Sequence, residues 1–252
     1  MLTLDNVICR AGGKVRLSIE SLNVEAGQFT AVVGPNGAGK TTLFKAISGE
    51  QAYTGDIHFY DRPLSQWLSL ERARHLAVLP QASQLSFPFT SKEVVEIGLT
   101  PLSLSAADAR ARVTEVMQMT HCQHLSNQFY PSLSGGERQR VQLARVLLQL
   151  SQASRGPLLL LDEPTSAQDL GQQHHLLSLV RSLCAERGFA VLAILHDLNQ
   201  VLHYSDKCLL LRNGELSRMG SPSEVLSEDS IAEHWQYRPE RLVRSGLGHL
   251  YF

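Results

Sequence analysis

The segment Gly34–Thr42 reads GPNGAGKTT, and it constrains the fold of this chain more than any other stretch. It fits the pattern G-x-x-x-x-G-K-[ST] and lies between an apolar run, Phe29–Val33, and a helical pattern, Thr42–Ile47. Glycines let successive backbone N–H groups curve around phosphate oxygens, and the N-terminus of the next helix contributes the positive end of its dipole. The sequence therefore predicts a phosphate-binding loop. Its expected members are Gly34, Pro35, Asn36, Gly37, Ala38, Gly39, Lys40, Thr41 and Thr42.

Two further apolar runs, Leu158–Leu161 and Ala190–Leu195, are nearly continuous rather than alternating. This pattern is typical of strands that are buried on both faces of a parallel sheet. Helical patterns over Arg138–Leu150 and His174–Ala185 separate these strands. Strands that alternate with helices predict an α/β fold around a parallel sheet.

The two ends of the chain predict antiparallel structure. Val15, Leu17 and Ile19 alternate with polar residues, which indicates a half-exposed strand and an N-terminal antiparallel β subdomain. Near the other end, Asn213-Gly214 separates the stretches 209–211 and 215–219 and favours a tight hairpin turn. The sequence SPSE at 221–224 then has the pattern of a helix start, with a capping serine and a proline in the first turn.

The segment 82–156 predicts an inserted helical subdomain. It contains an amphipathic pattern over Ser103–Met119, an interruption at Tyr130-Pro131 and a polar connector over Leu150–Pro157. The flanking segments 1–81 and 157–252 then form one core, so residues 1–252 are expected to make a single domain with an insertion.

Polar residues follow several of the predicted strands at the point where each strand ends. Asp162 and Glu163 follow Leu158–Leu161, His196 follows Ala190–Leu195, and Gln81 follows the short apolar stretch LAVL. Each alone is weak evidence, but the carboxyl ends of parallel strands open onto one crevice. We expect Asp162 to bind Mg²⁺ and Glu163 to polarise a water for attack on the γ-phosphate. Gln81, a neutral amide, can reach Mg²⁺ or water.

The segment Leu133–Glu137 reads LSGGE and opens the helical pattern over Arg138–Leu150. One interpretation is a capping box formed by Ser134 and Glu137. The other is an open helix N-terminus, in which Ser134, Gly135 and Gly136 grip a terminal phosphate. Because this motif lies in the insertion, a second copy of the chain is better placed to offer it to the phosphate loop than the same copy.

Composition excludes several functional classes. The 23 Lys+Arg and 24 Asp+Glu give a formal net charge of -1, which argues against a globally basic nucleic-acid binder. No apolar run reaches the roughly 20 residues that a membrane-spanning helix needs, so we expect no direct membrane insertion. The segment MLTLDNVICR has no basic head before an apolar stretch, which predicts a chain that stays in the cytoplasm. The scattered Cys9, Cys122, Cys184 and Cys208 are expected to be buried free thiols.

Taken together, these motifs resemble those of ATP-binding-cassette (ABC) ATPases over essentially the whole chain. The shared motifs, in the family's order, are GPNGAGKTT, Gln81, LSGGE, LLLLDEP, the loop at 166–169 and His196. The resemblance implies a P-loop NTPase core and ATP with Mg²⁺ as cofactors, with Thr41, Gln81 and Asp162 as metal-side residues. It also implies that Lys40, Gln81, Glu163 and His196 serve catalysis. Ser134, Gly135, Gly136, Glu137 and Asp169 would contact nucleotide at the interface of a head-to-tail homodimer.

Two positions depart from the family pattern. The family stacks adenine on an aromatic ring near the first strands, but Val7–Gly13 (VICRAGG) contains none, so stacking would fall to Arg10 or another side chain. The loop between sites has Gln168 where the family usually has Leu.

Longer stretches resemble the importer ATPases for iron chelates, heme and vitamin B12. Within that group, FPFT at 87–90, Val94-Val95 and the connector Leu150–Pro157 are most similar to heme importers. The implied partners are a transmembrane permease docked around Gln81 and Phe87–Val95 and, indirectly, a substrate-binding protein. The implied location is peripheral, on the cytoplasmic face of the inner membrane. Adjacent His174 and His175 point to different faces of a helix, so we expect them to be solvated rather than heme ligands.

Three alternatives remain open from the sequence. A ferric siderophore or vitamin B12 importer would use the same motifs. A soluble ABC ATPase acting on nucleic acid or ribosomes would be expected to carry basic patches, a coiled insertion or a duplicated cassette. A P-loop small-molecule kinase would leave LSGGE and His196 without a role.

Overall fold

The computed structural model describes residues 1–81, 87–166, 168–244 and 248–251. Within these residues, ten strands form one sheet in the order β5-β4-β1-β2-β10-β9-β3-β8-β7-β6. The strands are β1 (Leu2–Ala11), β2 (Lys14–Val24), β3 (Phe29–Val33), β4 (Tyr53–Phe59), β5 (Arg62–Pro63), β6 (Leu76–Leu79), β7 (Leu158–Asp162), β8 (Ala190–Ile194), β9 (Lys207–Arg212) and β10 (Glu215–Gly220), with a separate pair β11 (Arg241–Arg244) and β12 (Gly248–Tyr251).

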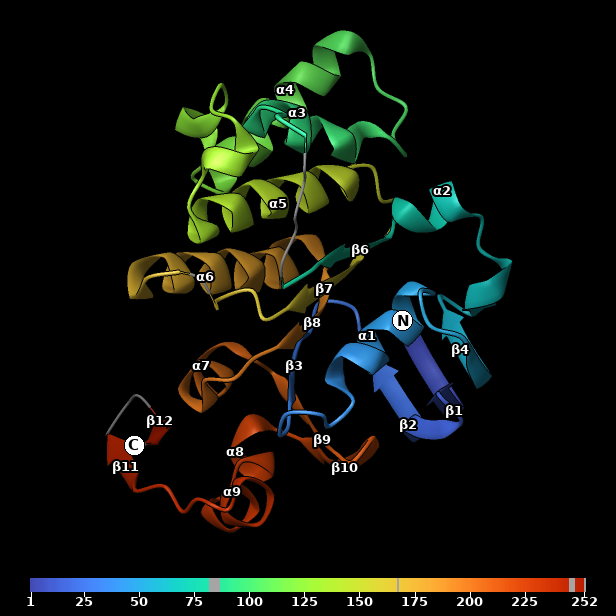
Figure 1. Ribbon diagram of the computed structural model, residues 1–252, viewed down its shortest axis with the longest axis vertical. Helices are drawn as coiled ribbons and strands as arrows, with labels where there is room; N and C mark the ends of the chain where they lie inside the picture. The colour runs from blue at the N-terminus through green and yellow to red at the C-terminus, as the bar shows by residue number, and fades with distance from the viewer. Residues whose placement is uncertain (82–86, 167, 245–247, 252) are drawn as a thin grey trace.

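Helices connect the strands and cover both faces of the sheet (Figure 1). The helices are α1 (Lys40–Ser48), α2 (Ser69–Ala73), α3 (Ser91–Glu96), α4 (Ala106–Met119), α5 (Gly135–Gln149), α6 (Leu170–Arg187), α7 (Leu198–Tyr204), α8 (Pro222–Val225) and α9 (Glu228–Trp235). Short 3-10 turns lie at Leu64–Gln66, Ile97–Leu99, Gln123–Leu125 and Tyr130–Ser132.

The predicted parallel core is confirmed. Strand β3 pairs in parallel with β8 and β9, β8 pairs with β7, and β7 pairs with β6. Every residue of β3 and β8 is buried, which is the burial that their continuous apolar sequences predict. Alternate residues of β7 enter two hydrophobic cores, one on each face. Leu159 and Leu161 lie with the buried side of α5, while Leu158 and Leu160 lie with that of α1.

The predicted antiparallel parts are also confirmed. Strand β1 pairs antiparallel with β2 and β4, and β9 with β10. Asn213 and Gly214 both have positive φ, 51° and 85°, as a two-residue hairpin turn requires. The expected alternation holds for Leu17 and Ile19, which are buried, but Val15 is 48% exposed. Val15 pairs with Arg10 next to a register shift near the end of the hairpin, beyond the reach of the core.

The middle of the chain has helices but no named strand between residues 91 and 149, and α3, α4 and α5 form the upper part of Figure 1. Residues 82–86, which open the predicted helical subdomain, lie outside the described residues. The predicted start of the helix at Ser103 is wrong by three residues. Ser103 bonds to Gln152 through its backbone N–H and C=O, and Ser105 instead caps α4 by accepting the N–H of Asp108.

Two other helices begin earlier than predicted. Helix α5 starts at Gly135 rather than Arg138, because Ser134 is its N-cap. Helix α6 starts at Leu170 rather than His174, because the side chain of Asp169 accepts the N–H of Gln172. In both cases a capping side chain, rather than the apolar pattern, sets the first turn.

The four cysteines are free and buried, as predicted. Burial raises the pKa of Cys208 to about 12 and, together with the charge of Asp206, that of Cys184 to about 12. These thiols therefore pack as small apolar groups. In the part of the chain that the structure describes, no helix is both long and apolar enough to span a bilayer.

Candidate nucleotide-binding site

The site lies at the carboxyl edge of β3, β7 and β8. Val32 pairs with Ile194, and Ile194 pairs with Asp162, so the residues that follow these strands are neighbours. This register brings the phosphate loop, Asp162-Glu163 and His196 to one edge of the sheet. The loop leads directly from β3 into α1, as the motif predicts.

The phosphate loop depends on its glycines in different ways. Gly34 has φ +147°, and a Cβ there would lie 2.2 Å from the carbonyl oxygen of Leu211. Gly39 has φ +101° and is the N-cap of α1. Gly37 also has positive φ, +78°, but a Cβ there would meet nothing within 4 Å. The first two are required for packing, whereas Gly37 leaves open space over the loop, which is what a backbone cradle for phosphate needs.

Lys40 is held inside this loop. Its Nζ donates hydrogen bonds to the carbonyl oxygens of Gly34, at 2.7 Å, and Pro35, at 3.0 Å. The residue is only 7% exposed. Burial lowers the pKa of Lys40, while the nearby carboxylates of Glu163 and Asp162 act in the opposite direction. The ammonium group is therefore desolvated and fixed before any anion approaches, which strengthens its interaction with phosphate.

Glu163 is the centre of the hydrogen-bond geometry. One carboxylate oxygen, Oε1, lies 2.7 Å from Nε2 of His196, and the other, Oε2, accepts a hydrogen bond of 2.5 Å from Nε2 of Gln81. His196 and Glu163 thus lie at one edge of the sheet, as the sequence predicts. The hydrogen bonds of Gln81 and His196 to the Glu163 carboxylate were not predicted. Glu163 also has a positive φ of 50°, which is uncommon for a residue with a side chain.

Asp162 is the last residue of β7 and is partly buried. Burial and the adjacent charge of Glu163 raise its pKa, and Lys40, His196 and Lys45 offset part of this effect. A carboxylate that is costly to ionise in the free protein gains from a cation placed beside it.

The oxygen donors at this edge fit Mg²⁺. The hydroxyl of Thr41, the carboxylate of Asp162 and the amide oxygen of Gln81 are hard ligands. No group of three or more His, Cys, Asp or Glu side chains suited to a metal ion occurs in the described ranges. Mg²⁺ fits this sparse set, because it usually takes one or two carboxylates and completes its shell with phosphates and water.

The segment LSGGE forms the capping box at the start of α5. The hydroxyl of Ser134 accepts the N–H of Glu137 at 3.4 Å, and Oε2 of Glu137 accepts the backbone N–H of Ser134 at 2.8 Å and its hydroxyl at 2.7 Å. These hydrogen bonds lower the pKa of Glu137. Helix α5 and helix α1 contribute to the cores on opposite faces of the sheet. The capping interpretation is confirmed, and it leaves Gly135 and Gly136 in the first turn of α5.

Two residues at the site were not identified from the sequence as functional. Gln139, on α5, is 7% exposed and donates from Nε2 to the carbonyl oxygen of Glu163 at 3.3 Å. Gln168, seen only as a departure from the usual Leu, donates from Nε2 to Oε1 of Gln139 at 3.3 Å. The one feature of the sequence that could have indicated Gln139 is an amide among the apolar positions of α5. Asp169 is placed as the N-cap of α6, and Ala167 lies outside the described residues.

The adjacent histidines do occupy different environments, but neither is simply solvated. His174 is exposed, and its Nδ1 bonds to the hydroxyl of Tyr204. His175 lies 3.2 Å from the carbonyl oxygen of Met119, and its ring stacks on His121 with centroids 3.7 Å apart. The expectation of solvated side chains is therefore wrong for His175, because α6 packs against the end of α4 there.

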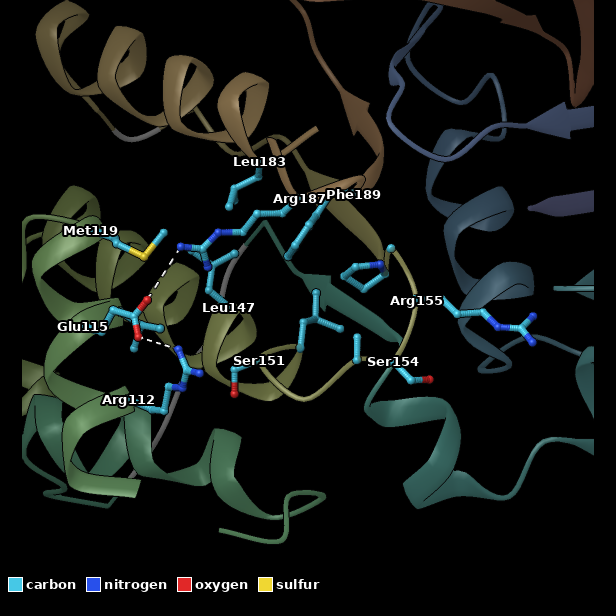
Figure 2. A pocket seen from close by; sticks show the side chains of 15 residues that line it. Arg112, Glu115, Met119, Leu147, Ser151, Ser154, Arg155, Leu183, Arg187 and Phe189 are labelled. Carbon is cyan, nitrogen blue, oxygen red and sulfur yellow. Dashed lines mark hydrogen bonds and ion pairs between the residues drawn. The ribbon is translucent and has the colours of Figure 1, made fainter. Parts of the chain in front are cut away.

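A cavity of about 360 Å³ lies elsewhere, where α4, α5, the connector after α5 and the end of α6 meet (Figure 2). In Figure 2 the carboxylate of Glu115 lies between Arg112 and Arg187, at 2.8 and 3.6 Å. The walls of the cavity include Leu147, Leu183 and Phe189. None of the lining residues belongs to the site at the sheet edge, so this cavity is separate from it.

Replacing Asp162 by Asn is expected to raise the melting temperature of the nucleotide-free chain at pH 7. Folding raises the pKa of Asp162, so the folded state binds this proton more tightly than the unfolded state. The stability that this group contributes therefore falls as pH rises from the ordinary Asp range, about 4, through the raised value. An amide removes this loss, so the difference should shrink at acidic pH. Thermal unfolding at several pH values checks this prediction, with Asp56→Asn, at an exposed residue of β4, as the control. Equal melting temperatures for Asp162→Asn and the wild type at every pH would contradict it.

The fold and the site together define a P-loop nucleotide hydrolase of the ATP-binding-cassette class. The family model described as ABC transporter matches residues 17–166. The chain is 50% identical over 238 residues to the hemin import ATP-binding protein HmuV of Shewanella denitrificans, covering 94% of each chain. It is 43% identical to the protein of the same name from Vibrio cholerae, over 90% of this chain and 88% of that one. A dimeric ATP-binding cassette in a post-hydrolysis state with ADP and Pi superimposes with a TM-score of 0.78, at 26% identity, over 88% of this chain and 99% of that chain. The chain belongs to the ABC transporter family and is an ATP-binding ATPase of that family.

Proposed function

We propose that this chain is the ATPase subunit of a heme importer and that it works as a homodimer with ATP bound between the two copies. The observation that supports heme as the substrate is the 50% identity, over 94% of the chain, to a hemin import ATP-binding protein. The dimer is supported by the dimeric cassette with which the fold superimposes. The proposed division is a nucleotide-binding core of 1–81 and 157–252 with a helical subdomain of 82–156.

The site residues have distinct proposed roles. The backbone of Gly34–Thr42 and Lys40 bind the phosphates of ATP, while Thr41, Asp162 and Gln81 hold Mg²⁺, which would neutralise phosphate charge when bound. Glu163 is the general base that takes a proton from the attacking water, because its carboxylate is fixed by two hydrogen bonds and remains 22% exposed to solvent. His196 orients Glu163 and contacts the γ-phosphate.

The second copy completes the site in this proposal. Ser134, Gly135, Gly136 and Glu137 of the partner approach the γ-phosphate at the N-terminus of its α5, and Asp169 lies at the same interface. An observation in support is that α1 and α5 contribute to the cores on opposite faces of one sheet. Adenine stacking falls to Arg10 or another side chain near β1.

The proposed permease contact is an exposed aromatic surface made of Phe87, Phe89 and Phe129. These side chains are 70%, 39% and 56% exposed. The rings of Phe87 and Phe89 have centroids 6.2 Å apart, and Thr90 forms an isolated antiparallel β-bridge with Phe129. Exposed apolar groups gathered in this way are typical of a protein interface. Docking here would hold the chain at the cytoplasmic face of the inner membrane. Movement at the ATP site would then reach the permease through the segment that begins at Gln81.

The test is to purify the chain with its permease, reconstitute them in vesicles and measure ATP hydrolysis with hemin-loaded binding protein. We expect hemin to stimulate hydrolysis, and a ferric siderophore or cobalamin with the matching binding proteins to leave the rate near its basal value. Stimulation by either of those ligands instead of hemin would reassign the substrate. Replacing Phe87 by Ser should reduce stimulation but not basal hydrolysis, and Leu68→Ser, at another exposed apolar residue, serves as control.

A further inference from the structure

Glu163 has a backbone conformation that needs support. Its φ of 50° lies in the left-handed region, which costs free energy for a residue with a side chain and persists where the surroundings hold it. Two donors reach its carbonyl oxygen, the N–H of Ser166 and Nε2 of Gln139, each at 3.3 Å. The second comes from α5, two residues after the LSGGE segment, and not from the loop itself.

Gln139 is in turn oriented by Gln168. The amide of Gln168 donates to Oε1 of Gln139 and to the carbonyl oxygen of Pro164, both at 3.3 Å. Since an amide has one acceptor and one donor end, accepting from Gln168 fixes the NH₂ of Gln139 toward Glu163. A leucine at 168 could not supply this hydrogen bond.

The other side of the same loop is held by a second pair of amides. Gln173 on α6 donates to the carbonyl oxygens of Gln168, at 2.9 Å, and Thr165, at 3.2 Å. Gln200 on α7 donates to Oε1 of Gln173 at 2.7 Å and lies 3.3 Å from the hydroxyl of Thr165. Neutral amides thus connect α5, α6 and α7 to the loop that follows Glu163, without adding charge beside the phosphates.

We propose that Gln139 and Gln168 are positioning residues for ATP hydrolysis: they hold the backbone of Glu163 so that its carboxylate stays between Gln81 and His196. This inference rests on the proposed role of Glu163 as general base. It also explains why a polar residue at 168 is useful in this chain. Through the hydrogen bonds of Gln139, helix α5, whose first turn carries part of LSGGE, becomes part of the support of the catalytic carboxylate.

A mutant cycle with methionine tests this, because methionine has nearly the size of glutamine and makes no such hydrogen bonds. Steady-state ATP hydrolysis by the purified full chain is measured for Gln139→Met, Gln168→Met and the double variant. We expect kcat to fall about tenfold for Gln139→Met and about threefold for Gln168→Met, with KM unchanged. The double variant should be no slower than Gln139→Met, since Gln168 acts through Gln139.

Two further measurements separate positioning from stability. Gln168→Met removes two long donated hydrogen bonds, but it also removes Oε1 of Gln168, which is buried with no hydrogen-bond partner among the described residues, so the melting temperature should change little. Gln172→Met is the matched control, because Oε1 of Gln172 is likewise buried without a partner in the described part of the chain and Gln172 lies on α6, beyond the loop at 164–168. Its kcat should stay near the wild-type value.

Each result has a distinct consequence. Additive losses in the double variant, or a fall in kcat that follows a fall in melting temperature, would overturn the positioning role of this amide pair. Hydrolysis that survives in Glu163→Gln would instead remove the general base on which the inference rests. Failure of hemin to stimulate the reconstituted transporter would change the proposed substrate and leave the amide pair untouched.

Discussion

Glu163→Gln is expected to lower kcat for ATP hydrolysis by about 10²- to 10⁴-fold, the range that general-base catalysis contributes. The amide keeps the size of the side chain and an oxygen that can face Gln81 or His196, but it cannot take a proton from water. The affinity for ATP should remain near the wild-type value, because the phosphate loop and Lys40 are unchanged. Rapid-quench or steady-state hydrolysis, together with equilibrium binding of ATP, measures the two effects separately.

The matched control is Glu186→Gln, an exposed glutamate near the end of α6. It makes the same chemical change far from the sheet edge and should hydrolyse ATP at the wild-type rate. If Glu163→Gln kept more than about a tenth of the wild-type kcat, the base would have to be another group at this edge, and His196 would be the first to test.

Lys40→Ala is expected to weaken ATP binding by about 100-fold or more and to abolish measurable hydrolysis at ordinary ATP concentrations. A charged hydrogen bond contributes about 1.5–3 kcal/mol, and the ammonium group here is desolvated and already fixed within the loop. Burial lowers the pKa of Lys40, so the positive charge does not stabilise the folded state, and its removal should not prevent folding. The variant should therefore fold. Equilibrium titration with a fluorescent ATP analogue measures the change in affinity.

Lys92→Ala is the control for charge removal. Lys92 is exposed on α3, where it pairs with Glu96 at 3.7 Å one turn along, and such surface pairs contribute little. Its ATP affinity should match that of the wild type. Near-normal binding by a folded Lys40→Ala protein would show that the backbone of the loop, rather than the lysine, supplies the affinity.

The sequence predicted best the strands whose residues are buried on both faces of the sheet. Strands β3, β7 and β8 have continuous apolar sequences, and their tips carry the polar residues that the structure brings together at one edge. The hairpin at Asn213-Gly214 and the cap at Ser221 were equally local, because a turn type and a cap depend on a few adjacent residues. Helix starts were less well predicted, since Ser105, Ser134 and Asp169 compete with the apolar pattern to set the first turn.

The amino-acid sequence by itself determined the phosphate loop and the α/β class, because each depends on short-range spacing and on the period of apolar residues. The order of the remaining motifs was interpreted through their resemblance to a family. Only the tertiary structure decided which side chains meet. Glu163 bonds to Gln81, 82 residues away, and to His196, 33 residues away. The support of its backbone by Gln139 and Gln168 was likewise invisible in the sequence. These contacts depend on how the helices pack over the sheet, and long-range packing of this kind has no local signature.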